Sequence, residues 1–212
     1  MMSLVYKDFM NLRVQAKLYA LIIAVWTVVA GMEKNPSFLG GVLSIFSILI
    51  AITSCAYDER AGWDKYALTM PIGKRELVLS KYVVSFLILG VGMLVFTGLN
   101  LYLQTEPMEF LGQIGIFVAL GLLAADIVLP IIFRFGTEKG RTFLMLIFLV
   151  PAVLGLVLGE LELPLKVTLT EMELSIGMLG VGILLLPLSM WMSFRMYGRR
   201  DMRSNENRKN SI

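Results

Sequence analysis

The chain has 212 residues, of which 57% are hydrophobic and 17% are charged, and its mean hydropathy is +0.77. Soluble domains are about a quarter charged, so this composition argues against a soluble globular protein. Histidine is absent and Cys55 is the single cysteine, which excludes an internal disulfide and removes the commonest metal ligand and general base.

Six long runs with few or no charges follow one another along the chain. A helix needs about 20 apolar residues to cross the hydrocarbon core of a bilayer. Five runs have that length, whereas the run between Lys17 and Glu33 has 15 residues and must include residues before it. The pattern predicts a single all-α domain over residues 1–212, a polytopic membrane protein. The expected spans are at about residues 16–33, 37–57, 78–103, 110–134, 142–159 and 174–196.

The residues before the first span are expected to form an interfacial helix. Apolar side chains recur at helical spacing at Val5, Phe9, Leu12 and Ala16. Lys7 and Asp8 lie mostly elsewhere around this helix, on its polar side. Such a helix lies along the membrane surface with its apolar face among the lipid headgroups; contact with a partner protein is a compatible alternative.

Basic residues are strongly segregated between the two sets of loops. Of the 19 lysines and arginines, 17 lie before the first apolar run, between the second and third runs, between the fourth and fifth runs, or after the last run. The other loops hold only Lys34 and Lys166. Because basic residues near membrane ends stay in the cytoplasm, six spans with both termini cytoplasmic are expected.

The segment between spans two and three, residues 58–81, mixes charges with aromatic side chains. Pro71 disfavours helix at the residue before it, and Gly73 adds a turn signal. We therefore expect a short cytoplasmic helix near residues 60–68, a turn at 70–73, and then the third span. A plain amphipathic connector is the alternative interpretation.

Two stretches resemble the short membrane subunits of type-2 ABC transporters, a class that includes subunits similar to those of phenol-soluble modulin exporters. The first matches at Asp58, Glu59, Arg60, Gly62, Trp63, Asp64, Lys65, Tyr66, Leu68, Pro71, Ile72, Lys74, Arg75, Glu76, Leu77, Val78, Lys81 and Tyr82. The second matches at Leu129, Pro130, Phe133, Phe135, Gly136, Glu138, Lys139, Gly140 and Arg141. Length and hydropathy also fit, so the resemblance covers essentially the whole chain.

The resemblance implies a permease subunit of the bacterial plasma membrane that pairs with a second copy or a close relative. Two copies of a separate ATPase would hydrolyse ATP with Mg²⁺, and the segment after span two would be the coupling helix that sits in a groove of the ATPase. The residues assigned to this coupling role are Asp58, Glu59, Arg60, Gly62, Trp63, Asp64, Lys65, Tyr66, Pro71 and Lys74. Export of a hydrophobic or amphipathic substrate is implied, with phenol-soluble modulins or antimicrobial peptides as candidates.

The chain itself is not expected to be an enzyme. It contains no G-x-x-x-x-G-K-[ST] sequence for phosphate binding, and we expect it to bind no cofactor, metal or nucleic acid. The glycines at 40–41 and 177–182 are expected to permit close approach of helices. By analogy with related exporters, the outer segment at 159–173, which Pro164 interrupts, would form short helices that dip toward the membrane.

Asp126 is the one charged residue between Glu109 and Arg134, in the run that contains the predicted fourth span. Asp126, Pro130 and Arg134 recur at intervals of four and so share a helix face. An ionisable residue within a span is a functional-site hypothesis by default: either a proton or substrate site, or a structural carboxylic acid. Three functions therefore compete, namely an ATP-driven export permease, a secondary transporter that uses Asp126, and a non-transport immunity or assembly factor.

Overall fold

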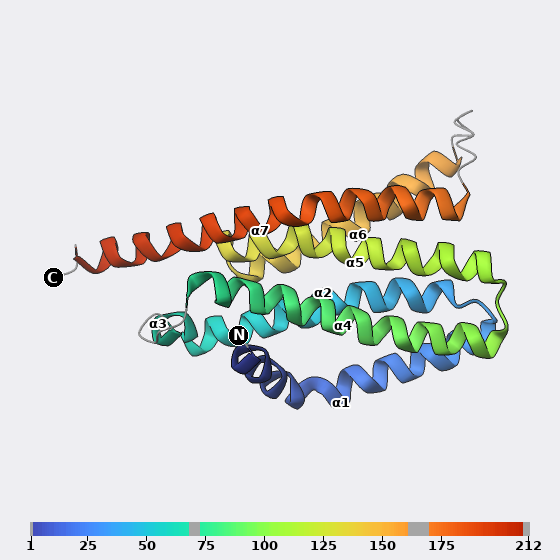
Figure 1. Ribbon diagram of the computed structural model, residues 1–212, viewed down its shortest axis with the longest axis horizontal. Coiled ribbons are helices and arrows are strands. Elements are labelled where there is room, and N and C mark those ends of the chain that lie inside the picture. Colours follow the sequence, from blue (N-terminus) through green and yellow to red (C-terminus); the bar gives the residue numbers. More distant parts are fainter. Residues whose placement is uncertain (1, 68–72, 161–169, 210–212) are drawn as a thin grey trace.

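The computed structural model describes residues 2–67, 73–160 and 170–209, and every regular element in these ranges is a helix. The helices are α1 (Met2–Glu33), α2 (Ser37–Ala61), α3 (Trp63–Ala67), α4 (Lys74–Leu103), α5 (Pro107–Phe135), α6 (Thr137–Glu160) and α7 (Glu171–Lys209). The long helices lie side by side in an elongated bundle, and α3 lies at one end of it (Figure 1). The all-α prediction is confirmed.

Five of these helices contain segments long and apolar enough to cross a membrane. The segments are Gln15–Glu33, Ser37–Ala61, Arg75–Leu103, Pro107–Phe135 and Glu171–Tyr197. They correspond to the first, second, third, fourth and sixth predicted spans, so the chain is a multi-pass membrane protein. The fifth predicted span, 142–159, falls in α6, which is helical over that range but is not among the five candidates found in the described residues.

The segment after the second span differs from the expected single helix at 60–68. Arg60 belongs to the last turn of α2, and this helix ends at Gly62, whose φ of 62° is left-handed. Glycine adopts this conformation without a steric penalty, and its N–H satisfies the carbonyls of Asp58 and Glu59. A separate five-residue helix, α3, then begins at Trp63. The turn predicted at 70–73 lies largely outside the described residues, as does most of the outer segment at 159–173.

The largest buried cluster joins α2, α4 and α5. Its fully buried members include Ile48, Ile52, Val78, Tyr82, Ala125 and Val128. Cys55 is buried in the same cluster, as expected of a small packing residue. These three helices form the centre of the bundle, and α1 packs against α2 and α4 (Figure 1).

Small residues let α5 and α7 run close together. A Cβ on Gly115 would lie 2.8 Å from the Cβ of Ser175, and one on Gly112 would lie 3.0 Å from the Cβ of Glu171. Of the glycines predicted to permit close approach, Gly40 is covered by the ring of Phe117. The prediction for the glycines at 177–182 is only partly correct, because Gly182 approaches α5 whereas Gly177 and Gly180 have no described neighbour within 4 Å.

The first turns of α1 are bent away from the rest of the helix (Figure 1). Leu4, Asp8 and Leu12, spaced by four residues, are buried against the bundle, with Asp8 0% exposed. Phe9 and Ala16 are exposed instead. The predicted division into apolar and polar sides is therefore wrong at Asp8, because a buried cation in α4 provides it with a partner that sequence spacing within α1 does not reveal.

Candidate functional site

A buried lysine in α4 holds together the end of the bundle that carries α3. The Nζ atom of Lys81 lies 2.8 Å from Asp8 Oδ1, 2.6 Å from Asp58 Oδ2 and 3.0 Å from Ser54 Oγ. Lys81 and both aspartates are buried. An ammonium group has three donors, and each has an acceptor here. The lysine thereby links α1, α2 and α4.

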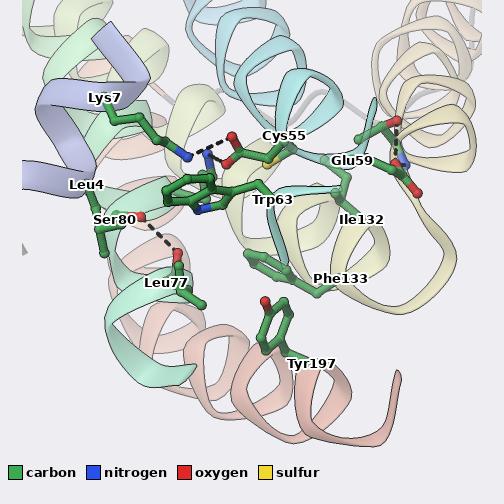
Figure 2. A pocket seen from close by; sticks show the side chains of 13 residues that line it. Leu4, Lys7, Cys55, Glu59, Trp63, Leu77, Ser80, Ile132, Phe133 and Tyr197 are labelled. Carbon is green, nitrogen blue, oxygen red and sulfur yellow. Dashed lines mark hydrogen bonds and ion pairs between the residues drawn. The ribbon is translucent and has the colours of Figure 1, made fainter. Parts of the chain in front are cut away.

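A second cation completes this cluster and extends it to α3. Lys7 Nζ lies 2.7 Å from Asp58 Oδ1 and 3.3 Å from Asp8 Oδ1, and it also lies 4.4 Å from the centre of the Trp63 ring. Figure 2 shows the Lys7 side chain lying over the Trp63 ring. Two lysines thus neutralise two aspartates. We call these four residues, Lys7, Asp8, Asp58 and Lys81, the charge cluster.

The space beside the charge cluster is small. The cavity lined by Lys7, Asp58, Trp63 and Lys81 has a volume of about 40 Å³. A water molecule needs at least 10–15 Å³ by this measure, whereas sites for organic ligands occupy roughly 300–1,000 Å³. The charge cluster therefore has room for a few waters but not for a substrate, and its role is to hold helices together.

Glu59 ties the end of α2 to the start of α6. Its Oε2 accepts hydrogen bonds from the backbone N–H of Thr137 at 3.0 Å and from the Thr137 hydroxyl at 2.8 Å. A carboxylate at a helix N-terminus satisfies donors that have no partner within the helix and interacts favourably with the helix dipole. Gly136, at a φ of 91°, makes the turn that brings Thr137 to Glu59. The sequence analysis did not predict this contact.

The structure places the predicted coupling residues at one end of the bundle but in different environments. Asp58 is buried and Trp63 is partly buried, whereas Arg60 is exposed and Tyr66 is 64% exposed. Gly62 is the left-handed residue that separates α2 from α3. Asp64 and Lys65 belong to α3, Lys74 begins α4, and Pro71 lies outside the described residues. Their role in docking an ATPase stays a prediction.

A second polar cluster joins α4, α5 and α7. The Tyr82 hydroxyl lies 2.6 Å from Ser189 Oγ and 2.9 Å from Ser193 Oγ. Ser189 Oγ donates to the backbone oxygen of Asp126 at 2.8 Å. A serine hydroxyl has one hydrogen, so Tyr82 must donate to Ser189 and can accept from Ser193. This chain of hydrogen bonds is buried and fixes α7 against α4 and α5.

The Asp126 side chain itself remains unpaired within the described structure. The residue is 6% exposed, and neither carboxylate oxygen has a hydrogen-bond partner among the described residues. Asp126, Pro130 and Arg134 line one groove between α5 and α7, with a volume of about 380 Å³. The spacing by four residues thus places them on one face as predicted. No ion pair joins Asp126 to Arg134 in the described part of the chain.

Adjacent residues of α4 belong to the two polar clusters. Lys81 points toward α1 and α2, and Tyr82 points toward α7. Successive residues of an α-helix are about 100° apart, so one turn of α4 can contact both sides of the bundle. Neither residue was singled out as a site from the sequence, although both stand in the stretch that resembles ABC transporter subunits. The sequence feature that could have indicated this site is the presence of an ionisable residue, Lys81, within the predicted third span.

Together, the spans and the polar clusters within them define a multi-pass helical membrane protein. The sequence carries no G-x-x-x-x-G-K-[ST] motif for phosphate binding. The chain belongs to the ABC-2 transporter family, because the family model described as "ABC-2 family transporter protein" matches residues 3–198. Membership supports an ABC permease, a membrane transport component that is not itself catalytic, and it implies an ABC ATPase as partner. No curated protein and no solved structure matches the chain.

Proposed function

We propose that the chain is the permease subunit of an ATP-driven exporter, with ATP and Mg²⁺ bound by a separate ATPase. The family match over residues 3–198 carries this proposal. In this proposal α6 is the fifth of six spans and both termini are cytoplasmic. This topology places 17 of the 19 basic residues on the cytoplasmic side of the membrane. Two permease chains, identical or closely related, assemble with two ATPases in a bacterial plasma membrane. The cargo is hydrophobic or amphipathic, with peptides such as phenol-soluble modulins or antimicrobial peptides as candidates.

In this proposal α3 and its flanks receive the movement of the ATPase. Arg60 and Tyr66 are exposed at this end of the bundle and offer a charge and an aromatic surface. Trp63 contacts Lys7, and Lys7 pairs with Asp58 in the charge cluster. A displacement of α3 would therefore be transmitted to α1 and α4 rather than absorbed by a flexible linker.

The same displacement would reach the far side of α4. Tyr82 follows Lys81 directly and is hydrogen-bonded to Ser189 and Ser193 of α7. Ser189 in turn contacts the Asp126 backbone. Rotation or translation of this turn of α4 would thus move α7 relative to α5 and change the groove that contains Asp126.

Co-purification of the permease with its ATPase tests the proposed function. We expect the ATPase to bind the native chain and Tyr66→Ala to weaken that binding about thirtyfold, because aromatic anchors often contribute about 2 kcal/mol or more at interfaces. The matched control is Tyr102→Ala, which truncates a tyrosine that is 80% exposed near the opposite end of α4. Equal binding by both variants would remove α3 as the docking element, and absence of any bound ATPase would contradict the permease proposal.

One observation favours a second candidate function. Asp126 is a buried, unpartnered carboxylate within a span, which is the feature expected of a proton-coupled transporter. Transport by the purified chain alone, driven by a pH gradient and abolished by Asp126→Asn, would establish this alternative. ATP-dependent transport that continues in Asp126→Asn, at whatever rate, would exclude it.

A further inference from the structure

We propose that the groove between α5 and α7 is a binding site for a lipophilic organic cation, whose positive charge is held by Asp126. That the bound cation is exported cargo rests on the proposed function. That it binds at this place rests on the groove alone. The site is formed by Asp126 together with apolar side chains from both helices.

The unpaired carboxylate indicates the charge of the ligand. A charged group that is taken out of water without a partner is costly, so a buried carboxyl group is either protonated or paired with a cation. Both oxygens of Asp126 lack a hydrogen-bond partner among the described residues, although the residue is 6% exposed. The aspartates of the charge cluster, by contrast, have lysines beside them. A cation in the groove would provide Asp126 with the same compensation.

The lining indicates that the cation is organic. Among the residues that line the groove, Ser189 supplies a hydroxyl beside Asp126, and its hydrogen is already donated to a backbone oxygen. Ca²⁺ and Mg²⁺ need six or more oxygen ligands, and the described residues contain no group of three or more His, Cys, Asp or Glu side chains that could hold a metal ion. The rest of the lining is largely apolar. A metal ion would find the Asp126 carboxylate but too few further oxygen ligands in this lining, whereas an apolar body around a single positive charge would match this surface.

The size and plasticity of the groove fit a molecule rather than an ion. Its volume of about 380 Å³ lies within the usual range of small-molecule sites, about 300–1,000 Å³. Leu185, Leu188, Met192 and Met196 of α7 line it. Methionine side chains are flexible and polarizable and adapt to differently shaped ligands. The site is therefore suited to a class of amphipathic cations rather than to one rigid compound.

Arg134 lines the same groove but does not neutralise Asp126. The two residues are eight positions apart, about 12 Å along the helix at 1.5 Å per residue. Arg134 is exposed, and its guanidinium lies 4.8 Å from the centre of the Phe135 ring. A cation at Asp126 therefore lies beyond the reach of this arginine. An anion would be attracted by Arg134 only at the end of the groove, and deeper in the groove it would be repelled by the Asp126 carboxylate.

The position of Asp126 explains why an apolar body is required. Asp126 lies nine residues before the end of α5 at Phe135, about 13 Å along the helix axis. Because α5 has 29 residues and is about 43 Å long, it extends beyond a hydrocarbon core of about 30 Å, and Asp126 lies within that core when the helix is centred on it. A hydrated ion would have to lose its water shell to arrive there, whereas a lipophilic cation enters from the membrane or from its edge with most of its surface already compatible with lipid.

Equilibrium dialysis of the full chain in nanodiscs of zwitterionic lipid tests the proposal. The probes are tetraphenylphosphonium and tetraphenylborate, which have similar shapes and opposite charges, and empty nanodiscs provide the baseline. We expect tetraphenylphosphonium to bind above baseline and tetraphenylborate not to. Asp126→Asn should weaken tetraphenylphosphonium binding at least tenfold. Glu106→Gln, which removes an equal charge at an exposed position, should leave it unchanged.

A second variant separates loss of the site from loss of the fold. Leu188→Trp adds volume within the groove and leaves Asp126 in place, so it should also abolish specific binding while the protein elutes normally on size exclusion. Normal binding by Asp126→Asn, or no binding by the native chain, would overturn the assignment. Binding needs no ATPase, so a chain that co-purifies with its ATPase but fails to bind tetraphenylphosphonium loses only this site, and the converse result contradicts only the permease proposal.

Discussion

Among the described residues, buried aspartates lie in two places of the bundle, and their surroundings differ. In the charge cluster, Asp8 and Asp58 each lie within 2.8 Å of a lysine, beside a cavity of about 40 Å³. Asp126 has no described partner and faces a groove of about 380 Å³. Paired charges in a closed space serve the architecture, whereas an unpaired charge beside an open apolar groove is available to a ligand. The contrast predicts that substitutions in the two places affect different properties.

The largest expected effect is loss of the central cation. Lys81→Met leaves Asp8 and Asp58 to share Lys7, and removal of one partner from a buried ion pair typically costs 3–5 kcal/mol. We expect a free energy of unfolding lower by about that amount, measured by denaturation in mixed micelles. Arg60→Met, which removes an exposed cation near the same end, is the control and should change stability by less than about 0.5 kcal/mol.

A compensating change tests whether charge balance is the cause. Lys81→Met combined with Asp8→Asn restores equal numbers of buried acids and bases, so the double variant should be more stable than Lys81→Met alone. Strictly additive losses in the two single variants would show that packing, and not pairing, explains the effect.

The next largest effect is expected from the polar link between α4 and α7. Tyr82→Phe removes the hydroxyl that contacts Ser189 and Ser193. Buried groups left without a partner cost about 1–3 kcal/mol, so we expect a loss of that size in the free energy of unfolding. Thr97→Val removes a hydroxyl that bonds only within α4, to the carbonyl of Met93, and should cost less. A cost in Thr97→Val as large as in Tyr82→Phe would contradict the link.

A smaller effect is expected where α2 meets α6. Glu59→Gln keeps an acceptor oxygen near Thr137 but removes the negative charge at the helix N-terminus. Loss of such a charge is typically worth 0.3–1 kcal/mol, which should appear as a small fall in the unfolding midpoint. Glu138→Gln, at an exposed position in the first turn of α6, provides a comparison without the contact to α2. Salt should reduce the difference between native and Glu59→Gln chains.

The smallest effect on stability is expected from substitution of Asp126. Asp126→Asn removes a charge that has no described partner, so the free energy of unfolding should be unchanged or higher, in contrast to the loss in Lys81→Met. Thermal unfolding in detergent, without added ligand, measures this. A destabilisation of 3 kcal/mol or more would show that Asp126 is a structural group with a partner, and the contrast between the two places would fail.

The candidate sites were predictable only in part from the sequence. The sequence indicated two candidate sites. The segment at 58–74 combines charges with aromatic residues, and Asp126 interrupts an apolar run. The charge cluster was not predicted, since its members are separated by up to 74 positions along the chain. The sequence indicated only that Asp8 lies away from the apolar face of its helix, because periodicity within one helix reports which residues share a face and not what packs against that face.

Sequence alone determined that this is a multi-pass helical membrane protein, because the length of an apolar run is a local property that can be compared directly with the thickness of a bilayer. Its motifs and length also indicated a type-2 ABC permease. The tertiary structure decided which charges neutralise one another and which one does not. Coulomb energies depend on distances of a few ångströms between side chains on different helices, and only the packing of α1 and α2 on α4, and of α7 on α5, sets those distances.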